Sequence, residues 1–153
     1  MKLLSNSILF LIINFGALAI GNWLMADGPQ KDWYIGLNKA PWTPPGWVFG
    51  MAWFTIMVCF SIYMAYLFKL LPNSKIITLF SIQFFLNISW NYVFFNKHLI
   101  GLGFVVILLL TILIGIFMFS FMKKLGPLTL LILPYFIWLL IASSLNGYIY
   151  YYN

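Results

Sequence analysis

Long runs of apolar residues, separated by segments that carry the polar and charged residues, set the pattern of this chain. Five of these runs approach or exceed the roughly 20 residues that a helix needs to cross a bilayer. They predict helices over residues 8–25, 47–70, 76–95, 99–121 and 128–150. The apolar–polar alternation of a membrane barrel is absent. We therefore predict an all-α integral membrane protein, in which five transmembrane helices form a single domain over residues 1–153.

The segments between the predicted helices differ in length. Those after the second, third and fourth runs are short, so consecutive helices are expected to run antiparallel in a compact bundle. The first link, about residues 26–46, is long, and a connection of that length in a small domain is usually functional or disordered. Its aromatic content argues against disorder, so we expect a long structured loop between the first two helices.

The stretch from Trp33 to Trp53 is the part of the chain least like a plain lipid-facing helix. It holds four of the seven tryptophans, together with three prolines and three glycines. Pro44 and Pro45 end the element before them, and Pro45 suits the first turn of the helix that follows. Two interpretations are open here: an aromatic belt at the membrane interface around a loop, and a structured lid over a binding cavity.

The first apolar run also has two interpretations. Lys2, the apolar stretch and the small residues Ala17-Leu18-Ala19 resemble a secretory signal with its cleavage site. Since nothing after this run resembles a soluble secreted domain, we expect a retained first helix. The same run contains Ala17-x-x-x-Gly21, a small-residue motif through which the helices of two copies could approach closely.

Composition supports the membrane assignment: 64% of residues are hydrophobic, 7% are charged, and the mean hydropathy is +1.02. Eight basic residues against two acidic ones give a net charge of +6. The lysines flank the apolar runs and do not gather on one face, so we expect a lipid bilayer as partner and no nucleic acid. They are Lys2, Lys31, Lys39, Lys69, Lys75, Lys97, Lys123 and Lys124.

The distribution of lysines also predicts an orientation. In the predicted topology, one side of the membrane carries Lys2, Lys69, Lys75, Lys123 and Lys124. The other side carries the remaining three lysines and both aspartates. This bias favours a cytoplasmic N-terminus, with the long loop outside. Lysine-only flanks and the lack of a targeting extension favour a bacterial cytoplasmic membrane.

The sequence contains few residues suited to acid–base catalysis or metal binding. Asp27 and Asp32 are the two acidic residues, so a pair of carboxylates inside the bundle for acid–base catalysis or metal binding is not available. His98 stands alone at a helix junction and is expected to be a surface residue rather than a metal ligand. No charged residue lies in the interior of a predicted helix, which argues against ion-coupled transport. We expect no metal site and no required cofactor.

Polar residues do recur inside two of the predicted helices at four-residue spacing, which places each set on one helical face. In the third helix they are Gln83, Asn87 and Asn91, with Trp90 beside them. Because an amide is costly in lipid, this face must point into the bundle. Hydrogen bonding between helices and contact with a ligand are both open for Gln83 and Asn91, and for Asn87 a ligand-facing role is favoured.

The fifth helix carries a second stripe, formed by Pro134, Trp138, Ala142 and Asn146. Pro134 is expected to bend this helix, and Ala142 leaves space where a larger side chain would fill it. Each residue alone is explained by packing. Two such stripes, with the tryptophan-rich stretch available to cover one end, favour an enclosed cavity. Trp53, with Phe49 and Met57 one turn on either side, provides a third wall.

Several ordered motifs together resemble the TspO/translocator-protein (TspO/MBR) family, also called the peripheral benzodiazepine receptor family. They are W-x-P-P-x-x-x-F-x-x-x-W from Trp42 to Trp53, L-N-x-x-W from Leu86 to Trp90, and P-Y-x-x-W-x-x-x-A-x-x-L-N from Pro134 to Asn146. Five helices with a long first loop is also the layout of that family. The chain is similar to its bacterial-type members.

This resemblance implies a cavity within the helices, closed by the first loop. Members bind tetrapyrroles such as protoporphyrin IX and haem, benzodiazepine and isoquinoline drugs, and, in animals, cholesterol. Carried onto matching positions, the implied ligand-binding residues are Tyr34, Trp42, Trp53, Asn87, Trp90, Trp138 and Ala142, with Trp42 in the lid. The cholesterol motif of animal members is not matched, because no basic residue follows Tyr148.

Three functions remain open on this basis. The favoured one is a membrane receptor or sensor for tetrapyrroles and hydrophobic drug-like ligands, with the porphyrin as ligand and not as cofactor. The second is light-dependent oxidative degradation of protoporphyrin IX, for which Trp53 and Trp138 are the residues implicated by the resemblance. The third is a passive carrier of an apolar ligand, porphyrin or lipid, across or along the membrane. The resemblance also implies a homodimer.

Overall fold

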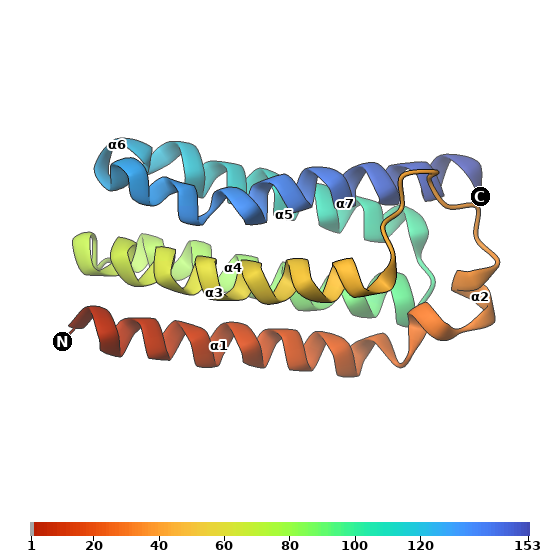
Figure 1. Ribbon diagram of the computed structural model, residues 1–153, viewed down its shortest axis with the longest axis horizontal. Coiled ribbons are helices and arrows are strands. Elements are labelled where there is room, and N and C mark those ends of the chain that lie inside the picture. Colours follow the sequence, from red (N-terminus) through yellow and green to blue (C-terminus); the bar gives the residue numbers. More distant parts are fainter. Residues whose placement is uncertain (1) are drawn as a thin grey trace.

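The computed structural model describes residues 2–153, and the regular structure in these residues is all helical. Five long helices lie side by side with their axes roughly aligned (Figure 1). They are α1 (Lys2–Met25), α3 (Gly46–Leu70), α4 (Ser74–Asn91), α5 (Ile100–Ser120) and α7 (Leu133–Tyr152). A π-helical turn, η2 (Tyr92–Asn96), continues α4.

Four of the spans are each long and apolar enough to cross a membrane: α1, α3, α4 with η2, and α5. A fifth arises when α7 is joined to the segment before it, Met122–Leu131, which is bent by 71° relative to α7. That segment consists of α6 (Met122–Leu125) and the 3-10 helix η3 (Gly126–Leu131). The molecule is therefore an all-helical integral membrane protein with four spans, or five if the bent pair is one.

The last helix differs from the prediction. A helix over residues 128–150 with Pro134 bending its interior was expected, but α7 begins at Leu133 and Pro134 lies in its first turn. A proline is tolerated there because the first amide groups of a helix have no intrahelical acceptor. The bend therefore lies between η3 and α7, before the proline. The first helix also differs, since it begins at Lys2 rather than near residue 8.

The long helices close into a ring. α1 packs against α3 and α4, α5 packs against α4 and α7, and a contact between α3 and α7 completes the circuit. A buried hydrogen bond from Asn14 Nδ2 to Ser61 Oγ, 2.9 Å long, joins α1 to α3. The first helix is thus an integral part of the bundle.

The small-residue motif on α1 is used inside the chain. Ala17 is 2% exposed, and Gly21 is buried where a Cβ atom would lie 2.7 Å from Nδ2 of Asn91 on α4. Gly21 therefore permits the close approach of α1 and α4. The expectation that Ala17 and Gly21 form a contact between two copies was wrong, because their own bundle covers them.

Side-chain hydrogen bonds also link the helices within the membrane region. Tyr135 on α7 donates to Oε1 of Gln83 on α4 at 2.8 Å, and both residues are buried. Tyr63 on α3 donates to the carbonyl of Phe117 on α5 at 3.0 Å. Of the two roles open for Gln83, the structure shows the interhelical one. Such bonds satisfy polar groups that lipid would leave unpaired.

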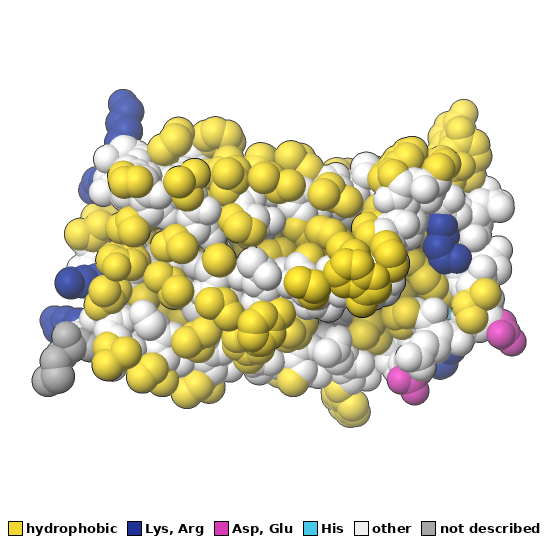
Figure 2. All heavy atoms as spheres, in the orientation of Figure 1, with side chains coloured by type: hydrophobic (Ala, Val, Ile, Leu, Met, Phe, Trp, Pro, Cys, Tyr) yellow, Lys and Arg dark blue, Asp and Glu magenta, His cyan; other side chains and the backbone are white. Residues whose placement is uncertain are grey.

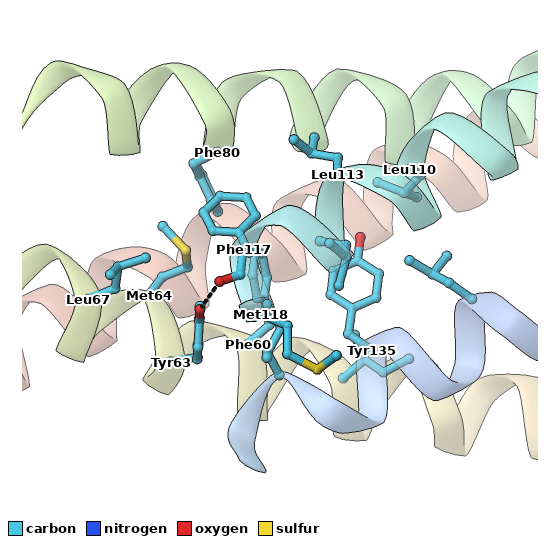
Figure 3. Close-up of a cluster of buried hydrophobic side chains, with 14 of the residues drawn as sticks. Phe60, Tyr63, Met64, Leu67, Phe80, Leu110, Leu113, Phe117, Met118 and Tyr135 are labelled. Carbon is cyan, nitrogen blue, oxygen red and sulfur yellow. Dashed lines mark hydrogen bonds between the residues drawn. The ribbon is translucent and has the colours of Figure 1, made fainter. Parts of the chain in front are cut away.

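The half of the bundle nearest the N-terminus is solid. Figure 3 shows side chains from α3, α4, α5 and α7 meeting around Phe60, which is fully buried. The Phe60 ring lies 5.1 Å from that of Tyr135, 6.0 Å from that of Phe80 and 6.1 Å from that of Phe117, between ring centroids. This dense aromatic packing leaves the other half of the bundle as the place for a cavity.

Charged side chains gather at the two ends of the bundle. Figure 2 shows lysines at the end that carries the N-terminus, and lysine with both aspartates at the opposite end. Between the ends, the surface shown is almost wholly apolar or uncharged. This is the surface expected of a protein with a hydrocarbon belt and charged flanks.

Candidate functional site

The connection between α1 and α3 crosses one end of the bundle (Figure 1). It contains a 3-10 turn, η1 (Gly28–Gln30), a short helix, α2 (Asp32–Ile35), and an irregular stretch over residues 36–45. We call residues 26–45 the cover segment. Its irregular stretch is tied to the end of α7 through Asn153, whose Oδ1 accepts from the Asn38 backbone amide and whose Nδ2 donates to the Asn38 carbonyl, both at 3.0 Å.

Aromatic contacts fix α2 over the junction of α4 and α5. The ring of Trp33 stacks on that of His98, with centroids 4.0 Å apart and planes 10° from parallel. Tyr34 meets Phe95 edge to face at 5.3 Å. His98 is exposed and adopts a positive φ of 58°, which turns the chain between η2 and α5. These contacts hold Tyr34 at the covered end of the bundle.

A cavity of about 590 Å³ lies beneath the cover segment. All five long helices contribute to its wall, together with η1, α2, the irregular stretch and η2. Its volume lies within the roughly 300–1,000 Å³ typical of small-molecule pockets. We call it the central cavity.

Six of the seven predicted ligand-binding residues line the central cavity. They are Tyr34, Trp53, Asn87, Trp90, Trp138 and Ala142. Residues from four separate elements therefore converge on one space, in the half of the bundle that the aromatic core leaves open.

Trp42 is the seventh, and the structure places it outside the central cavity. Its side chain is 54% exposed. Its Nε1 donates to Oγ of Ser144 at 3.0 Å, and its ring meets Tyr148 edge to face at 5.6 Å. Trp42 belongs to the cover segment as expected, but it fastens that segment to the outer side of α7 and does not face the cavity.

Two sets of polar groups on the α4 and α7 walls of the cavity differ in their hydrogen bonds. In the first, Trp90 Nε1 donates to Oδ1 of Asn146 at 3.2 Å, and Nδ2 of Asn146 donates to the Ala142 carbonyl at 2.8 Å. In the second, within residues 2–153, the Asn87 carboxamide makes no hydrogen bond, and the buried Nε1 of Trp138 has no partner. Buried polar groups are usually paired, so both are exceptions. The Asn87 carboxamide is available to a ligand on the cavity wall, whereas Trp138 Nε1 has almost no accessible surface.

The cavity carries positive charge. Lys39 lines it, and among the described residues no Asp or Glu does. The Lys39 ammonium donates to the carbonyl of Ile35 at 3.2 Å and lies 4.6 Å from the ring centroid of Tyr34. Burial raises the pKa of the Tyr34 phenol, which therefore stays protonated as a donor. An anionic group on a ligand would find a cation and donors here, without a competing carboxylate.

Some lining residues were not predicted from the sequence. Ala17, Leu18, Asn22 and Met25 on α1 line the cavity, yet no role there was expected for the first helix. Asn22, a polar residue near the end of an apolar run, was the available signal.

Two further residues were placed only partly by the sequence. Asn91 lines the cavity, and its Nδ2 donates to the Asn87 carbonyl at 3.3 Å on the same helix, so Asn91 makes no side-chain hydrogen bond to another helix. Of the two neighbours of Trp53, Phe49 lines the cavity and meets Trp138 at 5.3 Å. Met57 is 1% exposed and packs in the core instead.

Comparison of the sequence with known proteins finds one family and several relatives that match most of the chain. The sequence matches the TspO/MBR family over residues 8–152. It is 32% identical to "Tryptophan-rich protein TspO" of Archaeoglobus fulgidus, over 100% of this chain and 97% of that protein. It is 28% identical to "Tryptophan-rich sensory protein" of Cereibacter sphaeroides over 75% and 73% of the two chains. It is 31% identical to the sheep (Ovis aries) "Translocator protein", over 78% and 73%.

Proposed function

This chain belongs to the TspO/MBR family, and we propose that it is a membrane receptor that binds tetrapyrroles such as protoporphyrin IX and haem, and hydrophobic drug-like molecules, in the central cavity. The observation that carries the proposal is the convergence of Trp53, Asn87 and Trp138 on one cavity. The name "Tryptophan-rich sensory protein" of one relative agrees with a receptor.

A porphyrin suits the chemistry of the central cavity. It is a flat apolar disc, and indole rings such as those of Trp53 and Trp138 stack on such faces or pack edge-on against them. Its propionates are anions that can pair with the ammonium group of Lys39. Within the described residues, no histidine or cysteine lines the cavity. The proposal therefore requires no metal and no further cofactor, and free-base protoporphyrin IX is the ligand to test first.

The direct test is a titration in detergent micelles with protoporphyrin IX in the dark. Tryptophan fluorescence reports on binding, because Trp53, Trp90 and Trp138 all line the cavity. Saturable quenching at one porphyrin per chain, with a matching shift of the porphyrin absorption band, is expected. Quenching that rises linearly without saturation would mean that the porphyrin partitions into the micelle. This result would contradict the proposed receptor function.

Lys39→Gln should weaken the binding of protoporphyrin IX about fivefold to tenfold. The reason is that a charge-assisted contact with a propionate is worth roughly 1–1.5 kcal/mol more than the neutral contact that glutamine can make. The measurement is the dissociation constant from the same titration. The dimethyl ester of protoporphyrin IX lacks the carboxylates, so its affinity should be unchanged by Lys39→Gln. Lys31→Gln is the matched control, since Lys31 lies in the same cover segment but does not line the cavity.

Light-dependent degradation of protoporphyrin IX is a second candidate, favoured by the two tryptophans, Trp53 and Trp138, on the cavity wall. The porphyrin would act as photosensitiser, oxygen as oxidant, and the indoles as electron partners. Illumination in air should convert bound porphyrin to a new chromophore, and Trp53→Phe and Trp138→Phe should slow this conversion about tenfold while binding remains. The same rate with free porphyrin in empty micelles would contradict the activity.

A passive carrier is the alternative that the name "Translocator protein" of the sheep relative suggests. It would move an apolar ligand, porphyrin or lipid, across or along the bilayer. Flux of porphyrin into liposomes that rises with the amount of protein would support this function. Binding without such flux would contradict the carrier and would favour the receptor function.

We also propose that the chain lies in a bacterial cytoplasmic membrane with its N-terminus on the cytoplasmic side. The support is the lysine bias between the two ends of the bundle, which orients helical membrane proteins with the more basic end inside. A homodimer stays a prediction from the resemblance, and its interface must use residues other than Ala17 and Gly21.

A further inference from the structure

A second hollow lies on the outer face of the bundle, at the solid end. It is a groove of about 390 Å³ between α1 and α4, with α3 as its floor. Leu9 and Phe10 form one wall, Phe68 lies on the floor, and Ile76, Ile77 and Phe85 mark the opposite wall. We call it the outer groove. It shares no residue with the central cavity.

The outer groove is apolar throughout. Among its lining residues, Ser81 has the one hydroxyl, and this hydroxyl already donates to the Ile77 carbonyl at 2.8 Å. No polar group in the groove therefore awaits a partner, so a polar or hydrogen-bonding ligand has nothing to recognise there. The rings of Phe10 and Phe80, 5.0 Å apart and edge to face, close its inner side. This lining fits a hydrocarbon chain.

The length of the outer groove matches one leaflet of a bilayer. Its wall on α4 extends over ten residues, from Ile76 to Phe85, which are nine steps along the helix. At about 1.5 Å per residue this is about 14 Å along the helix axis. The hydrocarbon core of a bilayer is about 30 Å thick, so each leaflet contributes about half of that. The groove therefore runs along the path that an acyl chain takes from the interface towards the midplane.

The interfacial end of the outer groove is basic. Lys69 directly follows Phe68, and Lys75 directly precedes Ile76, and both lysines are exposed. Both aspartates of the described chain lie in the cover segment, at the opposite end of the bundle. A phosphate group at this interface would meet two cations without competition from a carboxylate.

We propose that the outer groove binds an anionic phospholipid, with one acyl chain along α4 and its phosphate between Lys69 and Lys75. The bound lipid would fill the gap between α1 and α4, two helices that meet elsewhere through Gly21 and Asn91. This site is independent of the function proposed for the central cavity, because a different half of the bundle forms it.

The test is native mass spectrometry of the full chain released from detergent after incubation with dioleoyl phosphatidylglycerol or dioleoyl phosphatidylcholine. Retention of one phosphatidylglycerol per chain, in preference to phosphatidylcholine, is expected. The double variant Lys69→Gln/Lys75→Gln should lower this preference about 30-fold, which corresponds to about fivefold for each lysine near an anionic headgroup. Glutamine keeps most of the side-chain length, and both positions are exposed, so the variant should fold.

Lys123→Gln/Lys124→Gln is the matched control. It removes the same charge at the same end of the bundle, from residues on α6 that do not adjoin the outer groove. This control should keep at least most of the preference for phosphatidylglycerol. Equal losses in the two double variants would mean that general surface charge attracts the lipid, and would overturn the site.

Filling the groove tests the acyl chain separately. Ser81→Leu places a larger side chain in the groove and should lower retention of both phospholipids about tenfold. The same spectra count protein copies. If Ser81→Leu changes the proportion of dimer and leaves lipid retention unchanged, the groove receives a second copy of the chain and the proposal fails. If this variant does not fold, the two lysine variants decide the question.

Discussion

Replacement of Ala142 by leucine is expected to lower the affinity for protoporphyrin IX by about 10- to 100-fold. Ala142 lines the central cavity on α7, between the levels of Trp138 and Asn146, so three added carbon atoms would project into the space that a ligand needs. Forcing extra methylene groups into an occupied site costs about 1–3 kcal/mol, which gives a loss of this size. Titration in the dark with quenching of tryptophan fluorescence measures it.

Ala19→Leu provides the matched control for this variant. Ala19 lies on α1, is exposed, and is not part of the cavity wall, so the same substitution there should leave the affinity unchanged. Ala142→Leu should remain folded, because the hydrogen bond that Ala142 accepts from Asn146 is to its backbone carbonyl. Wild-type affinity in a folded Ala142→Leu protein would remove this residue from the ligand site.

Phe60→Ala is expected to have the largest effect on stability, lowering the free energy of unfolding by about 2–4 kcal/mol. Phe60 is fully buried and contacts aromatic rings from three other helices (Figure 3). In a bilayer the lipid is as apolar as the core, so the cost comes from the empty space and lost packing rather than from transfer to water. Equilibrium unfolding in mixed micelles measures it.

Phe54→Ala is the control for Phe60→Ala on the same helix. Phe54 is 60% exposed, and its ring meets that of Phe15 edge to face at 5.4 Å. Its removal leaves no enclosed hole and should cost less than about 1 kcal/mol. The folded fraction of Phe60→Ala should still bind porphyrin, because neither Phe60 nor the rings around it line the central cavity. Equal destabilisation by the two variants would contradict this account of the core.

The sequence was informative about the site where lipid makes an amide expensive. Asn87 could not face hydrocarbon, so its position fixed the inward face of α4 and thereby the direction of Trp90. The four-residue spacing of Trp138 and Ala142 indicated the inward face of α7 in the same way. These residues line one cavity because a polar or small residue inside a membrane helix leaves few alternatives for the orientation of that helix.

The sequence was uninformative where the physical chemistry is ambiguous. An indole suits a cavity wall and a membrane interface equally well, so nothing in the sequence around Trp42 separates an inward ring from one that fastens the cover segment to Ser144. The first helix is largely apolar, and Asn22 was the one signal of its cavity-lining face, too little to predict that face. The continuous apolar residues before Pro134 similarly concealed the bend between η3 and α7.

The two hydrogen bonds between Asn38 and Asn153 have a consequence for kinetics. They join the cover segment to the last turn of α7, where Asn153 Nδ2 also donates to the Ile149 carbonyl at 2.9 Å. Movement of the cover segment away from α7 therefore requires both bonds to break, together with the bond from Trp42 to Ser144. For a ligand that passes at this end, entry and exit would then be slow steps governed by the opening of the cover segment. Such a ligand would have a long residence time even where its equilibrium affinity is modest.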